Sequence, residues 1–293
     1  MASTSITDNP SLATLGDAPT AADLQARDER LRRRDSLLRT AVPIAVVAGL
    51  LLLWELLVRV NHVPHYIIPA PSLILTTLVV NWDTLSGALW FTVKLTLLAL
   101  FAAIVGGVLL AVAFALFKWV EIGLFPIAVI LQVTPIIAIA PLILIYVSST
   151  TAALLLCAWI VAFFPILSNT VIGLKSADSN LRDLFTLYKA SPWQTFRYLL
   201  VPSALPYFMA GLKIAGGLSL IGAVVAEFTA GTAGRETGLA SRILESSFRT
   251  EIPMMFAALF LVSLLGIVIF LVFAGLSRAV LGHWHESEMK KER

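Results

Sequence analysis

Two charged residues lie inside a long apolar run in the last third of the chain, and they are the first candidates for a functional site. Lys213 follows Ser203, where the run begins, by ten residues, which is roughly 15 Å along a helix and near the middle of a bilayer. A lysine that faces lipid at that depth costs about 2.5 to 3.5 kcal/mol, so its ammonium is expected to face protein or water. Glu227 comes fourteen residues later, within about 40° of the same helix face.

The helix stripe that joins Lys213 to Glu227 also contains Gly217, and two interpretations of it stay open. The two charges are about 21 Å apart along the helix axis, which is too far for an ion pair. The stripe can line a polar pathway, with Glu227 at the outer mouth. Alternatively, its glycines serve close helix packing, and Glu227 binds Arg235 or Arg242.

Gln132 and Thr134 stand beside Pro135 in a second apolar run, which also contains Pro126 and Pro141. Each proline removes a backbone hydrogen bond and bends a helix, and inside lipid the freed carbonyl needs a protein or water partner. Irregular backbone of this kind belongs where a helix lines a cavity. We therefore predict that Gln132, Thr134 and Pro135 border a permeation path. A kink required only for helix packing is the alternative.

Motifs for catalysis and cofactor binding are not found in the sequence. It contains no Gly-x-x-x-x-Gly-Lys-Ser/Thr loop, so the chain is not expected to hold ATP in the P-loop manner. Its serines have no histidine and acid at the spacing of a catalytic triad. The four histidines, His62, His65, His283 and His285, have too few potential ligands beside them for a metal site. We predict a protein that is not an enzyme and binds no metal or cofactor itself.

The apolar content indicates the fold class. Hydrophobic residues make up 58% of the 293 residues, whereas soluble domains are about 45–50% apolar. About 20 apolar residues suffice to cross a hydrocarbon core of ~30 Å as a helix. Six such runs occur, near 41–59, 88–117, 121–147, 150–173, 203–227 and 252–281. We predict an all-α polytopic membrane protein with six transmembrane helices. Nucleic acid is not an expected partner, because no basic face lies outside the membrane flanks.

The lysines and arginines predict the orientation in the membrane. Fifteen of the 21 lie before the first apolar run, after the second and fourth runs, or near the C-terminal end. The alternate segments hold four, which are Arg59, Arg235, Arg242 and Arg249. Because cytoplasmic segments carry the excess of positive charge, both termini are predicted to be cytoplasmic. We divide the chain into a disordered cytoplasmic tail over 1–40, a transmembrane domain over 41–282 and a cytoplasmic tail over 283–293.

One polar segment, Asp183–Pro202, separates two apolar runs on the predicted cytoplasmic side. Leu184, Leu187 and Tyr188 recur at helical spacing up to Ser191, and the proline that follows suits the first turn of another helix. The pattern predicts a helix-turn-helix outside the bilayer, with its first helix over residues 183–191.

This segment resembles the cytoplasmic coupling loop of binding-protein-dependent ABC importer permeases, which reads E-A-A, three residues, G, nine residues, I-x-L-P. Asp183 stands at the E, Leu184 and Phe185 at the alanines, Lys189 at the G, Leu199 at the I, Val201 at the L and Pro202 at the P. The spacing is kept, and only the final proline matches outright. The following stretches, 205–213 and 226–227, look like the nitrate, sulfonate and taurine branch, and more particularly its members for pyrimidine or riboflavin-like vitamin precursors. The resemblance covers residues 50–277.

The resemblance implies a type I ABC importer permease in the bacterial inner membrane. It implies a homodimer, two separate ATPase subunits that hold ATP and Mg, and an extracytoplasmic substrate-binding protein. The coupling loop over 174–202 would dock into a cleft of the ATPase through Asp183, Leu184, Leu187, Tyr188, Lys189, Ser191 and Pro202. The implied solute is a small heterocyclic vitamin precursor, with a sulfonate or nitrate-type anion as the alternative.

A stand-alone secondary transporter is the alternative class of function. It would couple uptake to ions through the intramembrane charges Lys213 and Glu227. Secondary transporters often contain internal inverted repeats, and no convincing repeat relates the two halves of this sequence.

Overall fold

The computed structural model describes residues 21–231 and 237–282, with side chains from residue 41 onward. The chain divides into two compact units, Met1–His62 and Val63–Arg293. In the first unit, the helix α1 (Ala21–Val60) runs without interruption through Pro43. Residues 1–20 and 283–293 lie outside the described part, and with them His283, His285 and the predicted C-terminal tail.

Helix α1 takes in residues 21–40, for which the sequence predicted a disordered tail. The physical reason is the composition of that stretch, whose alanine, leucine, arginine, glutamine and glutamate residues are all strong helix formers. The charged residues therefore mark where the apolar run begins, but the helix begins earlier, at Ala21. Residues Ala41–Val60 are long and apolar enough to cross a membrane.

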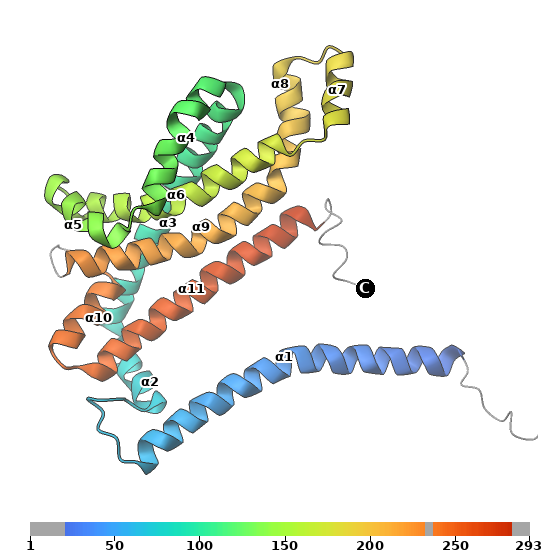
Figure 1. Cartoon of the computed structure of the whole chain (residues 1–293). Helices are drawn as coiled ribbons and strands as arrows, with labels where there is room; N and C mark the ends of the chain where they lie inside the picture. The colour runs from blue at the N-terminus through green and yellow to red at the C-terminus, as the bar shows by residue number, and fades with distance from the viewer. Residues whose placement is uncertain (1–20, 232–236, 283–293) are drawn as a thin grey trace, which may run out of the picture. The chain divides into compact units, whose positions relative to one another are not determined.

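In the second unit, all the regular elements of the described residues are helices, joined by turns and short loops (Figure 1). Its long helices are α3 (Trp82–Leu116), α6 (Thr150–Lys175), α9 (Val201–Ala230) and α11 (Ile252–Leu281). The shorter elements are α2 (Pro71–Val80), α4 (Lys118–Val133), α5 (Ile136–Tyr146), α7 (Ser179–Leu187), α8 (Pro192–Thr195), the π-helical turn η2 (Phe196–Leu200) and α10 (Leu239–Phe248). Figure 1 shows α7 and α8 at one end of α9 and α10 at the other.

Helices α6 and α9 form the centre of this unit because glycines let their backbones approach closely. A Cβ added to Gly173 would lie 2.8 Å from the Cα of Ala204, and one added to Gly222 would lie 2.9 Å from the Cα of Ala158. Helix α3 packs onto the other side of α6, where Gly107 meets Ile166. The three helices are therefore a tightly packed frame, against which the remaining elements lie.

The predicted spans are found, with one difference. Five helical segments are long and apolar enough to cross a membrane, namely Ala41–Val60, Trp82–Leu116, Thr150–Lys175, Pro192–Ala230 and Ile252–Leu281. The third predicted span, 121–147, is instead the helix pair α4 and α5, which are bent by 103° at a short break. Proline explains the break: Pro135 has no backbone N–H to continue the ladder, and Thr134 and Pro135 both adopt extended backbone.

Candidate coupling segment and pathway site

The polar segment folds as a helix-turn-helix, but its first helix has other bounds than expected. Helix α7 begins at Ser179 because the side chain of Asp178 accepts hydrogen bonds from the backbone N–H groups of Asn180 (2.7 Å) and Leu181 (3.3 Å). The helix ends at Leu187, and Lys189 adopts the left-handed conformation with φ 52°. The predicted helix over 183–191 is thus wrong at both ends, because strong local caps lie elsewhere.

Ser191 caps the second helix and does not extend the first. Its hydroxyl accepts from the N–H of Gln194 (3.2 Å), and the Gln194 side chain accepts from the N–H of Ser191 (2.7 Å). Helix α8 then passes through the π-turn η2 into α9, where Pro202 occupies the first turn. Ser191 therefore holds the turn, while Leu184, Leu187 and Tyr188 remain together on α7.

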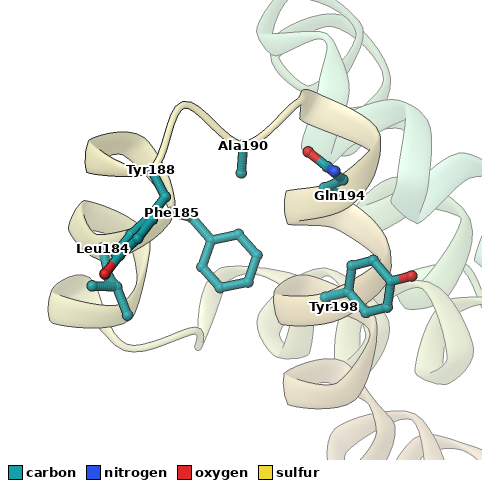
Figure 2. Close-up of a pocket in the computed structure, with 6 residues that line it drawn as sticks. All are labelled: Leu184, Phe185, Tyr188, Ala190, Gln194 and Tyr198. Carbon is teal, nitrogen blue, oxygen red and sulfur yellow. The ribbon is translucent and has the colours of Figure 1, made fainter.

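The two short helices enclose a groove with a volume of ≈ 510 Å³ (Figure 2). Its lining residues are Leu184, Phe185, Tyr188, Ala190, Gln194 and Tyr198. Figure 2 shows Phe185 pointing from α7 toward the opposite helix. Leu187 and Tyr188 are 79% and 82% exposed, and Asp183 and Lys189 are exposed beside them. Apolar side chains gathered on an exposed segment indicate a surface for a protein partner.

The break between α4 and α5 brings the predicted pathway residues to one pocket. Gln132, Thr134 and Pro135 line a cavity of ≈ 360 Å³, together with Pro165 of α6 and Leu218 of α9. The Thr134 hydroxyl donates to the carbonyl of Ile130 (2.7 Å). The bend thus opens a pocket against the central frame, and its lining contains no charged side chain among the described residues.

Lys213 and Gly217 also lie on α9, but they are not among the residues that line that pocket. Lys213 is half-buried and makes no hydrogen bond or ion pair within the described chain. Gly217 is exposed, and a Cβ added there would meet nothing within 4 Å. Together with Ile214 and Ile221, which are also exposed, Gly217 forms an apolar face along α9.

Glu227 is fully buried near the C-terminal end of α9 and faces away from that exposed apolar face. Its Oε1 accepts a hydrogen bond from the hydroxyl of Thr92 on α3 (2.8 Å), and its Oε2 accepts from the backbone N–H of Ala240 on α10 (2.9 Å). The Thr92 hydroxyl in turn accepts from the N–H of Leu239 (2.9 Å). The carboxylate therefore joins three helices. It satisfies the N–H group of Ala240, and the Thr92 hydroxyl satisfies that of Leu239, both at the start of α10.

The packing alternative gave Arg235 or Arg242 as the partner of Glu227, and Arg242 is not that partner, because it donates to Glu245 within its own helix (2.8 Å). Arg235, the other proposed partner, lies outside the described residues. The sequence did not identify Thr92, which is 135 residues away from Glu227 along the chain. It also did not identify Gly238, where an added Cβ would overlap the Glu227 carboxylate. No periodicity or motif marks either residue.

The chain belongs to the family of binding-protein-dependent transport system inner membrane components, whose family model matches residues 103–282. It is 34% identical over 246 residues to the riboflavin transport system permease protein RibX of Chloroflexus aurantiacus, covering 81% of this chain and 88% of that protein. It is also 34% identical over 237 residues to the formylaminopyrimidine transport permease protein ThiX of Halalkalibacterium halodurans, covering 79% and 91%.

Solved structures support the same fold. The inward-facing MetNI methionine ABC transporter matches with a TM-score of 0.53 at 20% identity, covering 67% of this chain and 95% of that chain. An amino acid ABC transporter crystallised with histidines matches with a TM-score of 0.55 at 16% identity, covering 69% and 95%.

The protein is thus the non-catalytic, multi-pass inner-membrane permease subunit of a binding-protein-dependent ABC importer. Membership of the family implies ATPase and binding-protein partners, and it sets aside the stand-alone secondary transporter. Across the described ranges, no group of three or more histidine, cysteine, aspartate or glutamate residues is arranged to hold a metal ion.

Proposed function

We propose that this permease imports a small heterocyclic vitamin precursor, of the pyrimidine or riboflavin-like kind. The similarity to RibX and ThiX, each 34% identical over about four fifths of this chain, is the observation that carries the proposal. The pocket at the α4–α5 break agrees with it, because the Gln132 amide and the Thr134 hydroxyl can hydrogen-bond a neutral heterocycle. A pathway for an anion would be expected to offer a cation there.

The solute is tested with the partner binding protein and with liposomes. We expect riboflavin or formylaminopyrimidine to raise the melting temperature of the binding protein, since a ligand that binds only the folded state stabilises it. The same compound should enter liposomes that contain permease, ATPase and binding protein, and only when ATP is present. A thermal shift with nitrate or alkanesulfonates alone would replace the heterocycle with the anion.

The working assembly is proposed to be a homodimer that meets through the exposed face of α9. Ile214, Gly217 and Ile221 make this face apolar, and Gly217 allows a second backbone to come close. A Gly217→Cys variant should form a cross-linked dimer in membranes under mild oxidation. The lone native cysteine, Cys157, is fully buried and serves as the background control. Failure to cross-link in an active complex would contradict this interface.

Coupling to the ATPase is assigned in this proposal to α7 and α8, with both chain termini on the same, cytoplasmic side. The exposed side chains of Leu184, Leu187 and Tyr188 support it, because a short helix laid into a groove gains affinity mainly from such apolar anchors. Asp183 and Lys189 would lie at the rim. The permease domain is proposed to span residues 41–282.

A further inference from the structure

Helix α7 follows α6 after a three-residue linker, and the side chain of Arg182 also holds it to the end of α6. The Nη2 atom of Arg182 donates to the backbone carbonyl of Leu174 (3.2 Å) and lies 3.4 Å from that of Lys175. These carbonyls belong to the last turn of α6, whose acceptors have no partner within the helix. A cation at this position is also favoured by the helix dipole. Displacing α7 therefore pulls on the C-terminal end of α6.

The same residue, Lys175, connects α6 to α4 through its side chain. The Lys175 ammonium forms an ion pair with the carboxylate of Glu121, in the first turn of α4 and 54 residues away in the sequence. Both charges also suit the helix ends on which they stand. The ion pairs of Arg242 and Arg249 with Glu245, by contrast, lie within α10. Lys175 thus contacts α7 through its backbone carbonyl, which faces Arg182, and α4 through its ammonium, which pairs with Glu121.

The far end of α4 reaches the predicted pathway. The helix has 16 residues, or roughly 24 Å, and it ends at the break beside the pocket that Gln132 and Thr134 line. Helix α6 is held to α9 by close glycine contacts along its length, whereas α4 ends at Val133, directly before the 103° bend to α5. A turn of α4 against the frame would therefore act on this bend.

We infer that Arg182, Lys175 and Glu121 form a mechanical relay, which passes movement of the coupling helix α7 to the α4–α5 break in the pathway. The relay makes these three side chains positioning residues for ATP-driven transport, and it rests on the proposed coupling role of α7. The pair of Lys175 and Glu121 is partly exposed, at 50% and 22% of the side chains. Exposed pairs contribute little to stability, so its loss should affect coupling and not folding.

The test uses the full chain, assembled with its ATPase and binding protein in liposomes, and a Thr134→Cys reporter at the pathway. The modification rate by a water-soluble thiol reagent is compared with and without vanadate-trapped ATP; the fully buried Cys157 gives little background. We expect ATP trapping to change this rate by about five-fold or more in the parent. In Glu121→Gln and in Lys175→Met the ratio should fall close to one, while the ATPase still binds.

Four further variants make the test specific. Arg249→Met breaks an ion pair of similar exposure, 64% and 22%, in α10 and should keep the parent ratio. Exchanging the charges, Glu121→Lys with Lys175→Glu, should restore part of the response because the pair re-forms. Arg182→Gln should lower the ratio as well, and combining it with Lys175→Met should add nothing, because serial links fail together.

A parent-like ratio in Glu121→Gln, or additive effects of Arg182→Gln and Lys175→Met, would overturn the relay. The variant Tyr188→Ala tests separately whether α7 couples to the ATPase. If Tyr188→Ala leaves ATPase binding and the ATP response unchanged, α7 is not the docking helix, and the relay falls with it. If Tyr188→Ala abolishes both and the relay variants abolish neither, only the relay is wrong.

Discussion

The two ends of α9 differ in how far other residues of this chain cover apolar side chains and supply hydrogen-bond partners. At the N-terminal end, η2 interrupts the regular ladder, and in the polar segment before it Lys189 has a left-handed backbone and Tyr188 is 82% exposed. At the C-terminal end, Glu227 is fully buried, and both of its carboxylate oxygens accept hydrogen bonds from neighbouring helices. The N-terminal end thus leaves apolar side chains exposed, whereas the C-terminal end is closed by residues of this chain.

This difference indicates which end of α9 contributes to stability and which to assembly. A buried carboxylate without a cation is stable only where donors surround it, so the C-terminal end behaves as a rigid joint between α3, α9 and α10. Exposed apolar side chains on a short helix make no stabilising contact until a protein covers them. Substitutions at the C-terminal end of α9 should therefore change stability, and substitutions at its N-terminal end should change assembly.

The largest effect is expected for Glu227→Leu. The substitution leaves the Thr92 hydroxyl and the Ala240 N–H buried without their acceptor, at a cost of about 1–3 kcal/mol for each group. The melting temperature of the purified permease should fall clearly. Glu227→Gln keeps one acceptor oxygen and should lose less. If Glu227→Leu were as stable as the parent, the C-terminal end of α9 would not be a joint.

A smaller effect, confined to assembly, is expected for Tyr188→Ala. If Tyr188 is a central anchor, the variant should bind the ATPase about 2 kcal/mol more weakly, or about thirty-fold in Kd. Its melting temperature should not change, because the side chain is exposed. Lys189→Ala, at the rim, should weaken association much less. Loss of association in Lys189→Ala with none in Tyr188→Ala would indicate electrostatic docking instead.

The smallest effect is expected for Lys189→Gly, which concerns the backbone alone. Glycine adopts positive φ without the steric cost that a Cβ brings, so the variant should be more stable by up to about 1 kcal/mol. Lys189→Val, with a β-branched side chain at the same φ, should be less stable than the parent. Thermal unfolding of the three proteins side by side measures this order. A Val variant as stable as the Gly variant would contradict a strained turn.

Much of the architecture could be predicted because it depends on local composition. A run of about 20 apolar residues has few alternatives to a membrane helix, and five helical spans lie close to the predicted ranges. The helix in the polar segment around Tyr188 could also be predicted, because its apolar residues repeat at helical spacing. Its exact bounds depended on which of several polar residues acts as a cap, here Asp178 and Ser191, and spacing does not choose between them.

The contacts between helices were decided by the tertiary structure alone. Periodicity indicates which face of a helix is apolar, but not which residue of a distant helix meets it. Thr92 meets Glu227 across 135 residues, and Glu121 meets Lys175 across 54, because α3, α4, α6 and α9 pack in one particular arrangement. The sequence by itself therefore determined the membrane spans and the polar segment between them. Only the packing of the helices decided that Glu227 closes the C-terminal end of α9 and that Lys175 contacts both α7 and α4.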